Sequence, residues 1–208
     1  RGNFIARSAD ELRESARAIG ESAFLVQRLI PGQLGSTVVL FDHGTPRAWL
    51  SSYKRKLFPE PHGPSSARQR VHLPGMEETL AGFGRMLGFH GIAGLYWVQP
   101  DEGGPALILE CNGRPSPYMN IITEVGLDLA AALRAMRAGT LTRMAPPETM
   151  GDEIAIFPQN VEHAIAKSDW GLLASWFLSP PGPLPWNEPR LFAAHLRLLL
   201  GQLARKSQ

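Results

Sequence analysis

Two pairs of apolar runs, each joined by a short glycine-containing turn, limit the folds open to this chain more than any other feature. The first pair is residues 36–41 and 46–53 around Asp-His-Gly-Thr, and the second is residues 91–98 and 105–112 around Asp-Glu-Gly-Gly. Glycine readily adopts the positive φ that tight hairpin turns need, so each pair is typical of two antiparallel strands. The sequence therefore predicts an antiparallel sheet.

Helical patterns occupy much of the remaining sequence. Ser8 and Glu11 form a capping box for a helix over 9–19, and residues 74–88 carry apolar side chains at helical spacing. The same patterns predict further helices at 123–139, 170–178 and 191–203, and strands at 24–30 and 154–157. Together they predict an α+β fold, an antiparallel sheet flanked by helices with a C-terminal helical extension.

The chemistry of the chain is concentrated where the second hairpin ends. Glu110 and Asn112 lie two residues apart in a predicted strand, and Arg114 follows them. Because side chains alternate across a strand, Glu110 and Asn112 should share one face. Carboxylate and amide oxygens suit Mg²⁺, which completes its shell with water and nucleotide phosphates. The competing interpretation is that both residues merely end an edge strand and cap a turn.

A second concentration of charge follows the first hairpin. Lys54, Arg55 and Lys56 come at the end of a predicted strand, where they could clamp a triphosphate or form a solvated basic cluster. Residues 58–66 are rich in proline and predict a rigid, lid-like loop, with Gly63 able to bring its backbone close to a ligand. His43, in the first turn, is expected to be a solvated loop histidine.

The segment Glu-Cys-Asn-Gly-Arg at 110–114 resembles the Glu-x-Asn-x-Arg signature of the ATP-grasp superfamily. Members of that superfamily activate carboxylates with ATP and join them to amines, thiols or other nucleophiles. Residues 25–32 resemble the hinge strand of the family, and Lys56 through Ser65 resembles the Pro-x-x-Gly-Pro-Ser loop of carboxylate-amine ligases. The resemblance covers residues 1–140 and leaves 141–208 as a C-terminal extension.

This resemblance implies a set of site residues and the cofactors ATP and Mg²⁺. The implied metal ligands are Glu110 and Asn112. The implied catalytic groups are Arg114, Lys54 and Lys56. The implied nucleotide contacts are Gln27, Arg28, Leu29 and Ile30 at the adenine, mainly through backbone atoms, with Gln33 in the region that often holds the ribose. The implied substrate loop contains Gly63, Ser65 and Ser116.

The strand expected to pair with Glu110 departs from the family pattern. Family members usually carry a further metal ligand there, most often an acid, and residues 91–100 contain neither Asp nor Glu. With a four-residue loop, the face of this strand that meets Glu110 should carry Leu95, Trp97 and Gln99. Gln99 is the oxygen donor among these three, so we predict it as a third metal ligand.

The beginning of the chain also departs from the family pattern. Residues 2–12 resemble the end of the glycine-rich segment and the helix that follows it, which lie well inside ATP-grasp enzymes. The two nucleotide-binding lysines that precede this point in the family have no counterpart here. We therefore expect a C-terminal portion that works with an upstream N-terminal part of the same protein and that turns over no ATP by itself.

Composition narrows the classes of function. The 208 residues carry a net charge of +2, too weak a field to favour nucleic acid, and no apolar run approaches a membrane span. Cys111 is the single cysteine, so no internal disulfide forms and the cytoplasm is favoured. Homo-oligomers are compatible with the sequence.

The sequence and the resemblance together predict an ATP-dependent carboxylate-amine ligase that forms an amide through an acyl phosphate. Its substrates would be a small-molecule carboxylate and an amine. Two alternatives stay open: a nucleotide-binding ATP-grasp module without catalytic activity, and a purely structural fragment.

Overall fold

The computed structural model describes residues 4–20, 23–60, 63–116, 118–124, 126–144, 146 and 149–206. The chain divides into two compact units, Arg1–Pro31 and Gly32–Gln208. In the first unit, helix α1 (Ala9–Ile19) begins as predicted, because Ser8 Oγ accepts a hydrogen bond from the Glu11 backbone N–H at 3.1 Å. Gly20 ends the helix with a φ of 71°.

The predicted strand at 24–30 is wrong, since residues 23–31 form no regular secondary structure. Strand β1 (Gly32–Asp42) begins only at Gly32, which pairs with Pro100 at the end of strand β4 (Gly91–Pro100). No β4 residue is left to pair with the chain before Gly32. An apolar run without a partner strand cannot satisfy its backbone hydrogen bonds in a sheet.

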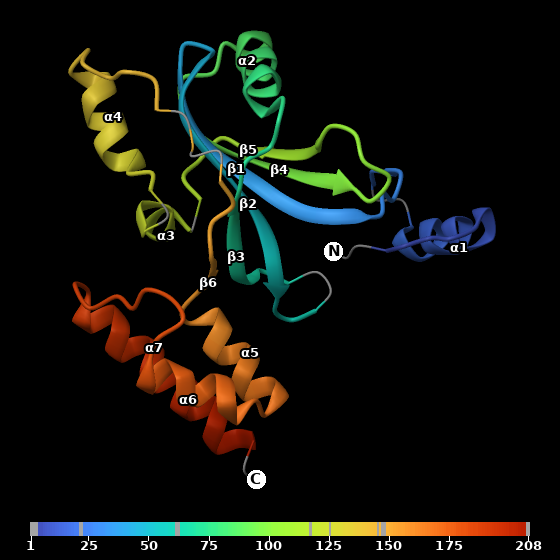
Figure 1. Ribbon diagram of the computed structural model, residues 1–208. Coiled ribbons are helices and arrows are strands. Elements are labelled where there is room, and N and C mark those ends of the chain that lie inside the picture. The colour runs from blue at the N-terminus through green and yellow to red at the C-terminus, as the bar shows by residue number, and fades with distance from the viewer. Residues whose placement is uncertain are drawn as a thin grey trace. The chain divides into compact units, whose positions relative to one another are not determined.

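The second unit is built on a six-stranded antiparallel sheet in the order β5-β4-β1-β2-β3-β6 (Figure 1). The remaining strands are β2 (Thr45–Leu57), β3 (Ser65–Val71), β5 (Leu107–Asn112) and β6 (Glu153–Ala155). Both predicted hairpins and the predicted edge strand are therefore confirmed. Strand β3 escaped prediction because Arg68 and Arg70 interrupt its apolar pattern.

Six described helices belong to this unit. They are α2 (Met76–Leu87), α3 (Met119–Glu124), α4 (Leu129–Arg137), α5 (Gln159–Lys167), α6 (Trp170–Leu178) and α7 (Pro189–Lys206). The single helix predicted at 123–139 is two helices, because Gly126 has a φ of 102° and Asp128 caps α4 through the Ala131 N–H at 2.7 Å. Among the described residues, no helix combines the length and apolar character needed to cross a membrane.

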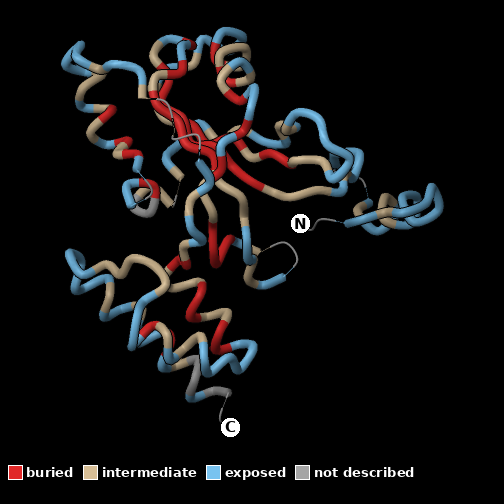
Figure 2. Tube along the Cα trace, in the orientation of Figure 1, coloured by how far each residue is buried: buried red, intermediate tan, exposed pale blue. Residues whose placement is uncertain are grey.

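The sheet separates two hydrophobic cores. Figure 2 shows its central strands as largely buried. One face packs against α2 through residues that include Val39, Phe41, Leu80, Leu95 and Trp97. The opposite face packs against α3 and α4 through residues that include Val38, Leu40, Leu50, Ile122 and Leu129. The predicted α+β class, with an antiparallel sheet flanked by helices, is confirmed.

Helices α3 and α4 meet only part of their face of the sheet. Along β1 the residues on this face are apolar at Leu40 and Val38 and become polar at Ser36. Along β2 the same change occurs between Leu50 and Ser52. The polar part of this face holds the candidate site.

Candidate functional site

One row of directly paired residues crosses five strands on this face. The row runs Glu110, Tyr96, Ser36, Ser52 and Arg70, from β5 through β4, β1 and β2 to β3. Directly paired residues of an antiparallel sheet project to the same side. Charged and hydroxyl groups from five strands therefore lie on one surface, at roughly 4.8 Å per strand.

Glu110 and Asn112 share this surface, as the sequence predicts. Asn112 pairs with Gly94, and its Nδ2 donates a hydrogen bond to Glu110 Oε1 at 2.7 Å. Glu110 is exposed, and Gly94 places no side chain opposite Asn112. A carboxylate and an amide oxygen are thus held together at an accessible strand end, which is a donor set suited to Mg²⁺.

Gln99 does not face Glu110, and its predicted place on the Glu110 face is wrong. Trp97 pairs with Ile108 but Tyr96 pairs with Glu110, so Leu109 is an extra residue in β5. This bulge exchanges the faces of all residues after Leu109, because a shift of one residue inverts the alternation of a strand. Gln99 therefore lies on the α2 side, where its Nε2 donates to the Gly104 carbonyl at 2.8 Å.

Lys54 lies over Tyr96, the direct strand partner of Glu110. Its ammonium lies 4.8 Å from the centre of the Tyr96 ring. Burial, followed by the positive charge of Arg68, lowers the pKa of Lys54, while the charge of Glu110 partly opposes this. An ammonium whose charge is poorly solvated is well suited to bind an incoming anion.

Lys54 and Lys56 have different surroundings. Lys54 pairs with Arg68 whereas Lys56 pairs with Ala67, so Arg55 is an extra residue of β2. Lys56 instead lies 3.3 Å from a carboxylate oxygen of Glu153 on β6, and Arg55 lies 3.8 Å from the same carboxylate. The catalytic role of Lys56 stays a prediction without support from its surroundings.

Arg68 is the site residue that sequence reasoning missed. Its side chain is only 6% exposed, yet no described carboxylate forms an ion pair with it. Its guanidinium donates to the hydroxyl oxygens of Ser36, of Ser52 at 3.0 Å and of Ser65 at 3.3 Å. Burial lowers its pKa from the ordinary value, which reflects the cost of keeping this charge away from water.

A small cavity opens beside Arg68. Its volume is about 20 Å³, and its lining includes Ser36, Ser52, Ser116, Tyr118 and Ile122. The Tyr118 ring lies 4.8 Å from the Arg68 Cζ. This space is large enough for one water molecule or one carboxylate oxygen.

The predicted substrate-loop residues contribute in different ways. Ser116 lines the cavity, whereas Ser65 is fully buried and acts through its hydrogen bond with Arg68. Gly63 is required by its own loop, because an added Cβ would meet the backbone of Phe58 and Pro59. The lid itself stays a prediction, and two residues of that loop, 61 and 62, lie outside the described residues.

Tyr96 is partly buried and lies between Glu110 and Ser36 in the row of paired residues. Its pKa is raised, first by burial and then by Tyr118 and Glu110, while Arg68 and Arg114 oppose the shift. Arg114 is exposed and follows Asn112 by two residues. The structure thus places Glu110, Asn112 and Lys54 on one face of the sheet, and the roles assigned to them and to Arg114 stay predictions.

The predicted nucleotide contacts remain predictions. Gln27, Arg28, Leu29 and Ile30 lie in the irregular segment of the first unit. Gln33 lies in β1, where its Nε2 donates to the Lys54 carbonyl at 2.8 Å and joins two strands. Its amide nitrogen therefore supports the backbone at Lys54.

No protein-family model matches the sequence, and no curated protein sequence matches it significantly. Solved structures are similar in fold. N5-carboxyaminoimidazole synthetase from Staphylococcus aureus, an ATP-grasp enzyme, has a TM-score of 0.53 and 9% identity, covering 81% of this chain and 47% of its own. The biotin carboxylase domain of a thermophilic 2-oxoglutarate carboxylase, bound to bicarbonate, has a TM-score of 0.47 and 14% identity, covering 68% and 35%.

This chain spans less than half the length of either solved structure. A likeness at such low identity concerns the fold alone. The fold of this chain is therefore similar to that of N5-carboxyaminoimidazole synthetase.

Proposed function

We propose that the polar face of the sheet is the active site of an ATP-dependent ligase that activates a carboxylate and joins it to an amine. The observation that carries this proposal is the presence of Glu110, Asn112, Lys54 and Arg68 on one sheet face. Metal ligands at one end and a buried cation at the other are what a reaction between a nucleotide phosphate and a carboxylate requires.

The β5 end would hold the metal and the nucleotide phosphates. Glu110 and Asn112 would hold Mg²⁺ through two oxygen ligands, and the ion would offset the negative charge of the nucleotide phosphates. Arg114 follows the same strand end and would contact the phosphates directly. Gln99 is not part of this metal site, so water and phosphate oxygens would complete the coordination.

The β3 end would hold the carboxylate to be activated. Arg68 is buried without an anionic partner among the described residues, and the cavity beside it has room for a carboxylate oxygen. Burying such a charge is costly unless an anion compensates it, and the substrate would supply that anion. Ser36 and Ser52 hold the guanidinium in place through their hydroxyl groups.

Lys54 would act between these two ends. Its ammonium projects over Tyr96, the direct partner of Glu110, and the strand of Lys54 also pairs with that of Arg68. It is therefore positioned to stabilise the phosphoryl group as it moves from the nucleotide to the carboxylate. Displacement of phosphate from the acyl phosphate by an amine would complete amide formation.

The second candidate function is a nucleotide-binding module without turnover. The absence of an acid among residues 91–100, together with the position of Gln99, favours it, since fewer charged ligands bind Mg²⁺ less tightly.

Release of ADP separates these functions. The full-length protein, including the N-terminal part expected upstream of this chain, is incubated with ATP, Mg²⁺ and paired panels of small carboxylates and amines, and ADP is measured. We expect release that requires both a carboxylate and an amine. Mg²⁺-dependent nucleotide binding without ADP release under any pairing would support the inactive module, and absence of nucleotide binding would leave a structural role.

A further inference from the structure

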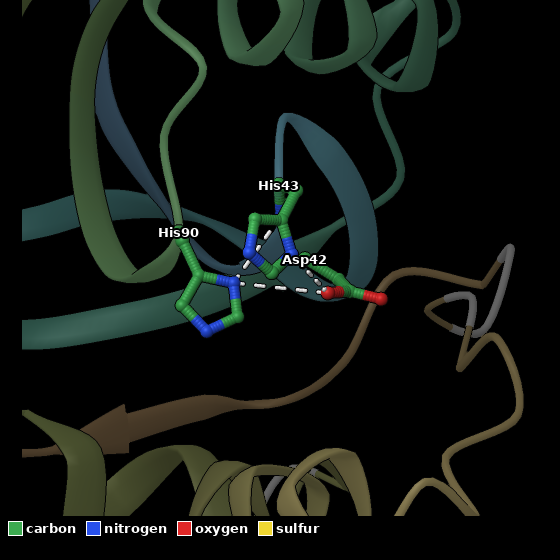
Figure 3. Close-up of side chains that lie close together, drawn as sticks. All are labelled: Asp42, His43 and His90. Carbon is green, nitrogen blue, oxygen red and sulfur yellow. Dashed lines mark hydrogen bonds and ion pairs between the residues drawn. The ribbon is translucent and has the colours of Figure 1, made fainter.

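Two imidazole rings and a carboxylate meet at the end of the sheet where β1 turns into β2 (Figure 3). Asp42 is the last residue of β1, His43 follows it in the turn, and His90 immediately precedes β4. Phe41 pairs with Gly91, so the residues after Phe41 and before Gly91 must lie side by side. The imidazole centroids are 4.2 Å apart. His43 is therefore not an isolated loop histidine.

The spacing of the donor atoms matches that around a small metal ion. Asp42 Oδ1 lies 3.0 Å from His43 Nδ1 and 3.7 Å from His90 Nδ1. One ligand atom from each residue can be chosen so that all three lie within 4.8 Å of one another. Ligand atoms at about 2.0 to 2.1 Å from a tetrahedral zinc ion are separated by roughly 3.3 Å. Small side-chain movements would bring the three groups to that geometry.

The two oxygens of Asp42 have separate partners. Oδ2 accepts hydrogen bonds from Arg47 Nε at 3.3 Å and Nη2 at 3.1 Å, which leaves Oδ1 directed at the imidazoles. Oδ1 also lies within hydrogen-bonding distance of His43 Nδ1, so both oxygens of the carboxylate are held in place. An outer partner that fixes one carboxylate oxygen is a common support for a metal ligand.

The backbone N–H of His43 is directed at a ring nitrogen of His90. His43 has a φ of 46°, and its N–H donates to His90 Nδ1 at 3.2 Å. A nitrogen that accepts a hydrogen bond carries a lone pair, so His90 Nδ1 can also serve as a metal ligand. Both histidines are exposed, and water can replace the bond that the N–H would lose.

We propose that Asp42, His43 and His90 bind a divalent ion of the zinc class, at a site separate from the Mg²⁺ site of Glu110 and Asn112. Two imidazole nitrogens and one carboxylate oxygen suit Zn²⁺, Cu²⁺ or Ni²⁺, whereas Mg²⁺ prefers oxygen ligands alone. Three protein ligands leave a fourth position for water or a further ligand.

Zn²⁺ titration of the protein by calorimetry, with Co²⁺ absorption as a second probe, tests this site. We compare wild type with His43→Asn, His90→Asn and the control His72→Asn, an exposed histidine elsewhere. Asn tolerates the left-handed backbone at position 43 and supplies an oxygen acceptor at position 90, so both variants should fold. Circular dichroism verifies this.

We expect one Zn²⁺ per chain, at least about tenfold weaker binding in each folded site variant, and unchanged binding in His72→Asn. Tetrahedral Co²⁺ bands should disappear in the same two variants. The proposal is overturned if wild type shows no saturable binding of one ion, or if His72→Asn weakens binding as much as the site variants, which would indicate adventitious histidine binding.

Discussion

The Lys54 ammonium lies 4.8 Å from the centre of the Tyr96 ring, over the strand that pairs directly with Glu110. This contact brings a basic group of β2 across β1 toward the predicted metal ligands. It also places the ammonium where burial and Arg68 disfavour its charge. The relationship between Lys54 and Tyr96 therefore has consequences for how the site responds to pH and to an anion.

Binding of Mg²⁺-nucleotide should take up protons at alkaline pH. Burial lowers the pKa of Lys54 in the free protein, and a bound phosphate would raise it again, so the bound state holds more protons between these two pKa values. Affinity should therefore fall as pH rises through the lowered pKa. Calorimetry in two buffers of different ionisation enthalpy measures the proton uptake.

Lys54→Arg is the matched variant, because arginine keeps its charge throughout this pH range. Its affinity should depend less on alkaline pH than that of wild type. Equal pH dependence in both proteins would assign the effect to another group, such as Tyr96, whose deprotonation would also repel an anion.

Glu110→Gln should remove the Mg²⁺ dependence of the proposed reaction. The substitution keeps the shape of the side chain and removes the negative charge that the cation needs. We expect folding to be retained and ADP release to fall by roughly a hundredfold or more. Mg²⁺ titrations of ADP release make the comparison.

Glu102→Gln is the control for Glu110→Gln, because Glu102 is an exposed acid in the turn of the same hairpin. It should behave as wild type. Asn112→Ala should resemble Glu110→Gln with a smaller loss, since it removes a neutral ligand. Wild-type Mg²⁺ dependence in Glu110→Gln would refute the metal site.

Arg68→Met should separate stability from substrate binding. Methionine fills similar space without a charge. The variant loses the hydrogen bonds of the guanidinium, which destabilises it, but it also avoids the cost of burying a charge, which stabilises it by a similar amount. We expect the free energy of unfolding to stay within about 1 kcal/mol of wild type or to rise. Stabilisation of the protein by a carboxylate substrate should disappear.

Urea unfolding measures the free energy of unfolding of Arg68→Met and wild type. The shift of melting temperature on adding a carboxylate measures the stabilisation by substrate. Arg85→Met, at an exposed position of α2, is the control and should keep the carboxylate effect. A strongly destabilised Arg68→Met that still responds to carboxylate would show that Arg68 is a structural residue.

Regular periodicity made much of the fold predictable. Both hairpins, α1, α2, α6 and α7 follow from alternating or helical patterns and from glycine and proline positions, whereas α5 was not predicted. The strand predicted at 24–30 failed because apolar composition does not reveal whether a partner strand exists at that register. Periodicity carries local information, and strand pairing is not local.

The site was predictable only where the alternation of a strand is unbroken. Glu110 and Asn112 were assigned to one face correctly, because no irregularity lies between them. Gln99 was assigned to the wrong face, because the extra residue Leu109 inverts the alternation of β5. No pattern in the sequence indicates that Arg68 is a site residue, because a buried arginine without an acidic partner cannot be distinguished in the sequence from an exposed one.

Deletion of Leu109 tests the bulge that orients the metal ligands. In the structure, Trp97 pairs with Ile108 and Tyr96 pairs with Glu110, with Leu109 as the extra residue between. Removing Leu109 would restore regular pairing while Glu110 still faces Tyr96. We therefore expect the deletion variant to fold and to keep its Mg²⁺-dependent nucleotide binding within about tenfold, since the ligands stay on the same face.

A different result follows if β5 pairs without a bulge. Glu110 would then pair with Leu95 in wild type, on the α2 face, and deletion of Leu109 would move it by one residue onto the face of Tyr96 and Lys54. Mg²⁺-dependent binding would then be much tighter in the deletion variant than in wild type. Calorimetric titration of Mg²⁺-nucleotide into wild type and the deletion variant, with circular dichroism to verify folding, distinguishes the two pairings because they predict different effects of the same change.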